Sequence, residues 1–223
     1  MITILNVETA TKNCSVSLAS DGKLIAIKEI AEENFSHAEK LHVFIEELLK
    51  ENNIDFKHLN AIAISQGPGS YTGLRIGVSS VKGLCYGLGL PMIALDTLEV
   101  LARQLKIEKG CIIPMIDARR MEAFTAIFNV DYTLVKPIEA TVIDEDTFSD
   151  LTEDIYLIGD GAGKCKTILN AANIHYSDDI IYPSAKEMAS MSYDKYVNED
   201  FVDVAYFEPF YLKDFVMTTK KNK

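Results

Sequence analysis

The sequence predicts an α/β protein made of two related lobes. In the first half, three short apolar segments precede alternating helical and apolar segments, an order typical of a mixed sheet with helices on its faces. The second half opens in a similar way, because the apolar segment 111–117 is followed after a turn by a second segment at 121–129. The 223 residues are enough for two lobes of about 100 residues each. We therefore predict lobes at residues 1–104 and 105–223, with a cleft between them.

Three strands are predicted at the start of the chain. They cover residues 2–9, 14–19 and 23–29, where apolar side chains dominate. Asp21 and Gly22 separate the last two strands, and Asp-Gly favours the tight turn of a β-hairpin. The first two strands resemble the pair that opens the second half, and this likeness is the basis for predicting an internal duplication.

The first helix is predicted from Ser36 to about residue 52. Ser36 and Glu39 form a capping-box pattern, in which the two side chains bond to free N–H groups at the helix start. Apolar and small residues fall on one arc of roughly 140° and predict a broad buried face. They are Ala38, Leu41, Phe44, Ile45, Leu48 and Leu49.

A short strand at 61–65 is followed by a turn rich in Gly and Pro and then by a helix with almost no charge. The turn at 67–73 contains Gly, which readily adopts positive φ, and Pro, whose ring fixes φ. Within 73–88 the only charged residues are Arg75 and Lys82, and they point within about 20° of each other. An uncharged arc of roughly 220° remains, whereas a helix that faces one core needs about 100°.

The glycines of this helix allow close contacts on two flanks. Gly73 and Gly77 lie on one flank, and Gly83 and Gly87 lie on another. Two interpretations are open. Either the helix is sandwiched inside one domain, or one of its flanks meets a partner chain.

The remaining elements are predicted from shorter apolar runs and turn signals. No low-complexity linker separates the two halves, so we expect the lobes to pack firmly against each other. The predicted elements are strands at 91–95, 133–142 and 155–158, with shorter pieces within 133–142, helices at 97–105, 162–171 and 184–196, and an extended end at 205–212.

The composition indicates a compact protein of a reducing compartment. Four widely separated cysteines form no CxxC pair, which argues against a disulfide framework or a metal site. The apolar start is interrupted by Asn6 and Glu8 and lacks a basic prefix, so we expect no signal peptide. No stretch approaches the roughly 18 apolar residues of a membrane span. We therefore expect a cytoplasmic protein with no membrane partner.

The net charge of −11 bears on the choice of partners. Binding to nucleic acid depends largely on Lys and Arg side chains that neutralise phosphates. An acidic chain is therefore not expected to bind a polynucleotide by itself.

Local patterns for catalysis or metal binding are weak. His37 and His42 point about 140° apart on the first helix, whereas a helical zinc pair needs i, i+4 spacing. No Ser, Cys or Thr has a His or Lys partner at local spacing, which leaves covalent catalysis without support. Asp117, with Arg119 and Arg120 at a strand end, is compatible with a phosphate or carboxylate clamp and equally with a structural ion pair.

Several short segments, spread in order over nearly the whole chain, carry a resemblance to a known family. They are Glu8-Thr9-Ala10-Thr11 with Cys14-Ser15-Val16, Ser36-His37-Ala38-Glu39, Gly67-Pro68-Gly69-Ser70-Tyr71-Thr72-Gly73-Leu74-Arg75-Ile76-Gly77, Ile116-Asp117-Ala118-Arg119-Arg120 and Gly159-Asp160-Gly161-Ala162. Together they resemble the TsaB family, also called YeaZ, of bacterial tRNA threonylcarbamoyladenosine biosynthesis proteins.

This resemblance implies a fold, a role and partners. The implied fold is two-lobed and similar to actin, sugar kinases and heat-shock chaperone ATPases, with a duplicated ribonuclease H-like arrangement. Family members are non-catalytic relatives of TsaD, the zinc- and nucleotide-binding subunit that transfers threonylcarbamoyl from its adenylate to the adenosine beside the anticodon. TsaB supports TsaD together with the ATPase TsaE. The resemblance therefore implies that this chain is not an enzyme and that it contacts tRNA only through the complex.

The resemblance also implies a partner surface. In the family, the amino-terminal helices form a helical bundle with TsaD, and the same surface can pair two copies when TsaD is absent. These helices correspond to residues 36–52 and 73–88. The implied interface residues are Phe44, Leu48, Ile76, Ser79, Ser80, Gly83 and Gly87.

A degenerate nucleotide site is implied as well, with no cofactor, no metal and no catalytic residue. Glu8 departs from the Asp that is usual at this position, and its longer side chain would reposition a metal-bound water. The site residues are Glu8, Thr9, Gly67, Gly69, Ser70, Thr72, Gly73, Arg75, Asp117, Arg119, Gly159, Asp160 and Gly161.

Two alternative functions stay open. The first is an independent sugar-kinase-like ATPase, which rests on analogy of fold. The second is a peptidase, against which the histidine spacing and the lack of a nucleophile argue.

Overall fold

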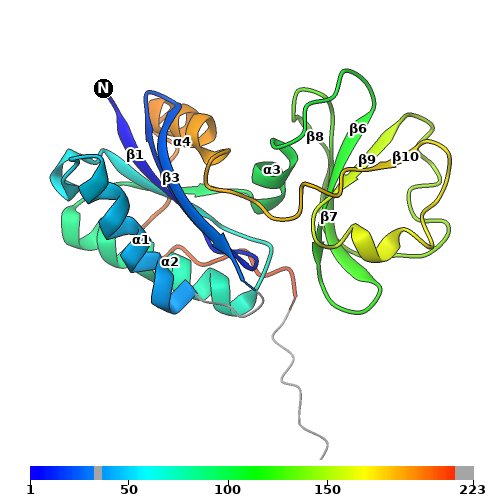
Figure 1. The fold of residues 1–223 in the computed structure, drawn as a ribbon, viewed down its shortest axis with the longest axis horizontal. Helices are drawn as coiled ribbons and strands as arrows, with labels where there is room; N and C mark the ends of the chain where they lie inside the picture. The colour runs from blue at the N-terminus through cyan, green and yellow to red at the C-terminus, as the bar shows by residue number, and fades with distance from the viewer. Residues whose placement is uncertain (33–36, 214–223) are drawn as a thin grey trace, which may run out of the picture.

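The computed structural model describes residues 1–32 and 37–213 and contains two lobes (Figure 1). Each lobe is built around a five-stranded sheet. The two sheets stand side by side, and helix α3 (Thr97–Ala102) lies between them. The predicted α/β class and the predicted two-lobed duplication are both confirmed.

The first sheet is formed by strands β1 to β5 in the order β3-β2-β1-β4-β5. β1, β2 and β3 pair antiparallel, whereas β1, β4 and β5 pair parallel. All of these strands lie where the sequence predicts them. They are β1 (Thr3–Glu8), β2 (Asn13–Ser20), β3 (Lys23–Ala31), β4 (Ala61–Ser65) and β5 (Met92–Leu95).

The second sheet repeats this topology in the order β10-β9-β6-β7-β8. β6 therefore corresponds to β1, β7 to β2, β8 to β3, β9 to β4 and β10 to β5, with the same parallel and antiparallel pairs. β10 was not predicted, because its three residues are too few to show a pattern. The strands are β6 (Cys111–Asp117), β7 (Glu122–Phe128), β8 (Leu134–Val142), β9 (Ile155–Ile158) and β10 (Ile174–Tyr176).

Helices cover both faces of the first sheet. α1 (His37–Glu51) and α2 (Tyr71–Leu88) pack on one face, and α4 (Met188–Val197) packs on the other (Figure 1). None of the helices in the described part of the chain has both the length and the apolar composition that a membrane crossing requires.

The last helix of each repeat covers the sheet of the other repeat. α3 follows β5 of the first sheet but packs on the second sheet, and α4 follows β10 of the second sheet but packs on the first. This exchange buries apolar side chains between the repeats and ties them together. The predicted boundary between residues 104 and 105 falls between α3 and β6, and the division into independent lobes at that point stays a prediction.

One prediction in the second half was wrong in kind. Residues 162–171 form only a 3-10 helix, η2 (Gly163–Cys165), followed by turns. So short a segment, with a glycine inside it, forms an α-helix only when packing supports it. The extended end at 205–212 forms no strand in the described residues, although Val202, just before it, makes an isolated bridge with Met92 of β5.

Other boundaries moved by small amounts. The pieces expected within 133–142 join into the single strand β8, and Ser36 of the predicted capping box lies outside the described residues. The helix predicted at 184–196 begins at Met188, because residues 183–185 first cross the first sheet. There, Asn13 Nδ2 donates to Pro183 O at 3.0 Å and Ala185 N–H donates to Ser15 Oγ at 3.0 Å.

The two glycine flanks of α2 have different environments. Gly73 and Gly77 face the turn after β1, and a methyl group at either position would collide with Thr9. In contrast, apart from the adjacent residues and the backbone of α2 itself, no described atom lies within 4 Å of the place that a Cβ of Gly83 or Gly87 would take. The first flank is therefore fixed by close backbone approach to the sheet, and the second is open.

This difference predicts opposite effects of two matched substitutions. Gly77→Ala should lower the free energy of unfolding by about 1–3 kcal/mol, because its methyl group overlaps the Thr9 hydroxyl and lies 3.0 Å from Ile64 Cδ1. Gly83→Ala should leave it unchanged or raise it by up to about 1 kcal/mol through helix propensity. Urea unfolding of both variants provides the measurement, and equal effects would contradict the assignment of the flanks.

Candidate functional site

The predicted nucleotide-site residues lie at corresponding strand ends of the two lobes. Glu8 ends β1, and Asp117 ends β6, the strand that corresponds to β1. A glycine-containing turn follows β4 at 67–73, and another follows β9 at 159–161. The duplication thus gives each lobe one carboxylate and one glycine turn in equivalent positions.

Glu8 is fully buried in the first lobe. Its Oε1 accepts a hydrogen bond from Ala10 N–H at 2.5 Å. Burial raises the pKa of this carboxyl to about 7, against the opposing effect of the Ala10 hydrogen bond. Below neutral pH the carboxyl is therefore mainly uncharged, and it is poorly suited to hold a metal-bound nucleotide.

The turn at 67–73 packs directly on the turn between β1 and β2. Ser70 N–H donates to Ala10 O at 2.6 Å, and Thr9 Oγ1 donates to Gly73 O at 2.9 Å. Ser70 also caps α2, since its hydroxyl accepts a hydrogen bond from Gly73 N–H at 3.3 Å. The start of α2, the kind of place where proteins bind anions, is thus engaged by the chain itself.

Arg75 faces aromatic rings near the start of α2. Its guanidinium carbon lies 4.0 Å from the ring centroid of Tyr71, and its Nε donates to Tyr211 Oη at 3.3 Å. The positive charge is therefore already engaged by this stacking. The other predicted residues of the turn differ in exposure: Gly67 is buried, Gly69 is half-buried and Thr72 is exposed.

In the second lobe, Asp117 is paired with a lysine that is distant in the sequence. Lys164 Nζ forms an ion pair with Asp117 and also donates to Arg120 O at 2.8 Å and Glu122 O at 2.6 Å. Asp117 N–H donates to Asp160 Oδ1 at 2.9 Å, and burial together with the Asp117 charge raises the pKa of Asp160. The ion pair of Asp117 is thus with Lys164 and not with a neighbouring arginine. No local spacing in the sequence indicates this pair.

The other predicted residues of the second lobe lie on two turns. Arg119 and Arg120 form the exposed tip between β6 and β7, with left-handed φ values of 69° and 53°. Gly159 and Gly161 pack on the end of β6, where Gly161 N–H donates to Met115 O at 2.9 Å. A methyl group at Gly159 would collide with the same carbonyl oxygen. This contact is the counterpart of the glycine contacts on the first lobe.

The described residues contain neither a cluster of metal ligands nor an activated thiol near these groups. No set of three or more His, Cys, Asp and Glu side chains in the described part is placed to hold a metal ion. All four cysteines are buried as free thiols, and burial raises the pKa of Cys14 and of Cys85 to about 12. Such thiols stay protonated and are not nucleophiles at neutral pH.

The predicted partner-surface residues divide between the core and an exposed face of α1 and α2. Leu48 is only 1% exposed and belongs to the core of the first lobe, so it offers a partner no surface. Phe44 and Ile76 are half-buried against the same core. Ser80 Oγ lies 3.2 Å from His42 Nε2 and links the two helices. Ser79, Gly83 and Gly87 are exposed.

The exposed face contains apolar side chains that were not predicted. Tyr86 of α2 is 86% exposed, and Val43 of α1 is 45% exposed. Tyrosine is enriched at protein interfaces, where its ring is buried by a partner. The sequence feature that could have indicated Tyr86 is its position three residues after Gly83, in a helix with almost no charge.

The fold and the site define a class of protein. The two lobes share one strand order and pairing, the first has the element order βββαβαβα, and each has a carboxylate at the end of its first strand. This is the architecture of actin-like ATPases and sugar kinases. The activator of 2-hydroxyisocaproyl-CoA dehydratase from Clostridium difficile, solved with bound ADPNP, has this fold. It matches with a TM-score of 0.50 at 8% identity, over 89% of this chain and 96% of that chain.

Comparison with known sequences and structures gives the family. The family model described as TsaD: tRNA N6-adenosine threonylcarbamoyltransferase matches residues 29–218. The tRNA threonylcarbamoyladenosine biosynthesis protein TsaB of Escherichia coli (strain K12) is 28% identical over 97% of this chain and 97% of that protein. YeaZ from Pseudomonas aeruginosa matches with a TM-score of 0.84 at 24% identity, over 95% of this chain and 100% of that chain. The chain therefore belongs to the TsaD family and, within it, to the TsaB (YeaZ) proteins.

The burial of Glu8 predicts a pH dependence of stability. Its pKa is about 7 in the folded chain, whereas its ordinary value is 4.5, so the folded state binds the proton more tightly than the unfolded state does. The resulting stabilisation is complete below pH 4.5 and is lost as the pH rises through 7, a change on the order of 3 kcal/mol. Urea unfolding across this interval should show the decline in the unmodified protein and a smaller one in Glu8→Gln. Parallel profiles would show that Glu8 is not the titrating group.

Proposed function

We propose that this chain is the non-catalytic partner subunit of a tRNA threonylcarbamoyl transferase complex. It binds TsaD through α1 and α2 and thereby stabilises and activates it. With TsaD and TsaE, it is required for transfer of the threonylcarbamoyl group from threonylcarbamoyl-adenylate to the adenosine adjacent to the anticodon, in tRNAs that read codons beginning with adenine. It acts in the cytoplasm and meets tRNA only within the complex. Two copies pair through the same helices when TsaD is absent.

The outer face of α2 is the observation that carries this proposal. Apart from Arg75 near its start, its exposed positions are small or uncharged, and Gly83 and Gly87 leave its backbone open to close approach by another helix. Tyr86 adds a large ring that the described residues leave uncovered. A contiguous uncharged surface of this kind marks a protein–protein contact.

The charged side chains of α2 are engaged by the carboxyl-terminal part of the same chain. Lys82 Nζ donates to Ala205 O at 3.0 Å and to Phe207 O at 2.9 Å, and Arg75 contacts Tyr211. Three parts of the chain therefore pack against α2: the first sheet, α1 and this carboxyl-terminal segment. The side that remains is the one without charge, which supports its use as a partner surface.

The first lobe supports a non-catalytic role. Glu8 is buried and mainly uncharged below neutral pH, and the start of α2 is engaged by the turn between β1 and β2. In the second lobe, Lys164 neutralises Asp117. The two carboxylates and the start of α2 thus have internal partners or, in the case of Glu8 below neutral pH, lack charge.

An independent ATPase is the second candidate, and one observation favours it. The activator from Clostridium difficile, which shares the fold, was solved with bound ADPNP. ATP turnover by the isolated chain, lost on Glu8→Gln or Gly161→Ala, would support this candidate. The structure argues against it through the contacts of Glu8 and Asp117 described above.

Gly83→Glu should abolish co-elution with TsaD while leaving a folded chain. The new carboxylate would be desolvated in the interface without a partner, which costs several kcal/mol of binding free energy. Gly163→Glu is the matched control, since Gly163 is also exposed and also has no described atom within 4 Å of its Cβ position, but lies in the second lobe. Size-exclusion chromatography with TsaD is the measurement, and circular dichroism checks folding. Equal co-elution of both variants would place the interface elsewhere.

The chain itself should be required for the modification. Threonylcarbamoyl transfer to unmodified tRNA is measured with TsaD, TsaE and the adenylate-forming enzyme, with and without this chain. Product is expected only when the chain is present. Equal product without it would overturn the proposed role and leave the ATPase as the function to test.

A further inference from the structure

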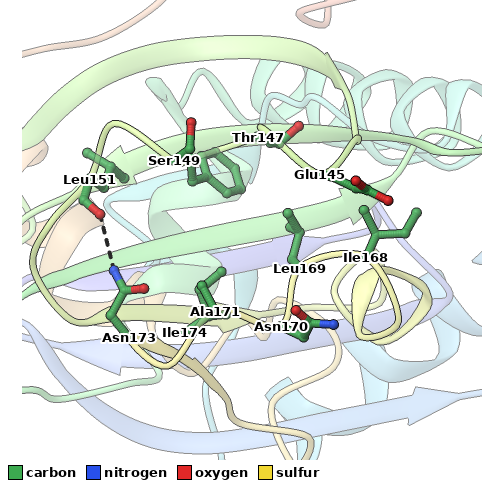
Figure 2. A pocket seen from close by; sticks show the side chains of 11 residues that line it. Glu145, Thr147, Ser149, Leu151, Ile168, Leu169, Asn170, Ala171, Asn173 and Ile174 are labelled. Carbon is green, nitrogen blue, oxygen red and sulfur yellow. Dashed lines mark hydrogen bonds between the residues drawn. The ribbon is translucent and has the colours of Figure 1, made fainter.

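The second lobe contains a cavity of about 250 Å³ that the proposed function does not use. Figure 2 shows two loops facing each other across it, one at 145–151 and one at 168–174. None of the predicted nucleotide-site residues is among those that line it. Its lining residues are Glu145, Thr147, Phe148, Ser149, Leu151, Ile168, Leu169, Asn170, Ala171, Asn173 and Ile174.

The duplication explains why a cavity exists at this place. In the first repeat, α1 connects β3 to β4 and α2 connects β4 to β5, and the two helices pack against each other. In the second repeat, the corresponding connections are the segments 143–154 and 159–173, which contain no α-helix. Loops fill less volume than a helix pair, so the seam between them stays open.

The lining combines an apolar floor with a polar rim. Phe148 and Leu169 are buried and belong to the core of the second lobe, and Ile168 packs against that core. On the rim, the carboxylate of Glu145 and the hydroxyl of Ser149 make no hydrogen bond or ion pair within the described residues. An occupant must therefore bring an apolar stem and hydrogen-bond donors.

Charge further restricts the occupant. The segment 143–154 contains six acidic residues and no basic one: Asp144, Glu145, Asp146, Asp150, Glu153 and Asp154. Of these, Asp154 alone forms an ion pair with a described residue, Lys109, and its Oδ1 also lies 3.0 Å from His175 Nε2. None of the residues that line the cavity is basic. The rim therefore has an uncompensated negative charge that attracts a cation.

We propose that this cavity anchors an arginine side chain presented by a basic protein partner. A guanidinium offers several N–H donors in one plane to the acceptors of the rim, and the three methylenes of its stem suit the apolar floor. The volume is below the roughly 300–1,000 Å³ of small-molecule sites, but it matches one side chain. Arginine is also enriched among the residues that dominate interfaces. This surface is separate from α1 and α2, and the proposal does not depend on the proposed function.

The test uses the full chain labelled with ¹⁵N and the blocked peptide acetyl-Gly-Leu-Arg-Leu-Gly-amide. In ¹H–¹⁵N NMR titrations, amide signals of 145–151 and 168–174 should shift, with a dissociation constant in the millimolar range. The peptide with citrulline in place of arginine is the neutral isostere and should bind at least about threefold more weakly. Equal shifts by both peptides, no shift at all, or shifts confined to other residues would each overturn the proposal.

Matched variants distinguish binding in the cavity from non-specific attraction of the cationic peptide to the acidic chain. Glu145→Gln should weaken binding of the arginine peptide about threefold to fivefold, and Ser149→Trp should abolish it by filling the mouth. Glu46→Gln removes the same charge from an exposed position of α1 and should leave binding unchanged. The NMR spectrum of each variant shows that it is folded. If Glu46→Gln weakens binding as much as Glu145→Gln, the attraction is non-specific and the anchor site is disproved.

Discussion

The packing of α2 on the turn after β1 is the contact on which the arrangement of the first lobe depends. Gly73 and Gly77 allow the helix to lie against Thr9, and Ser70 N–H donates to Ala10 O at 2.6 Å at its start. A helix held this closely at one end cannot roll about its axis without a collision between the chain segments. Its orientation is therefore fixed, and with it the direction in which the uncharged face points. A surface for a partner needs such fixed geometry.

In both lobes a glycine-containing turn packs on the first strand or on the turn that follows it, but different structures come next. In the second lobe Gly161 N–H donates to Met115 O, which lies within β6, whereas in the first lobe Ser70 N–H donates to Ala10 O, two residues beyond the end of β1. After that contact, the second repeat has loops where the first has α1 and α2. The contact thus orders the end of each sheet, whereas the helices depend on residues farther along the chain. This separation allows the two repeats to present different surfaces on one topology, which agrees with the general rule that function resides in sites added to a fold.

The parts that follow from local pattern were predictable from the sequence, and the parts that follow from contacts between distant residues were not. The strands at 61–65, 111–117 and 155–158 were predicted with the bounds that the structure shows, because apolar runs end there at turn residues. The pair of Asp117 with Lys164 spans 47 positions, and no spacing rule reaches across that distance. The burial of Glu8 could not be predicted from local sequence either, because it depends on how the turn at 67–73 folds over β1.

The contacts that leave the first lobe poorly suited to nucleotide chemistry are also those that orient α2. An open phosphate site at the end of β1 would need free N–H groups at the start of α2 and a charged carboxylate on β1. Here Ala10 O accepts from Ser70 N–H, the Gly73 N–H donates to the Ser70 hydroxyl, and Glu8 is buried. Opening that site would require the turn at 67–73 to move away from β1, and α2 would lose its support on the sheet. A fixed α2 and an open nucleotide site are therefore competing states of the same few residues, and this chain adopts the first.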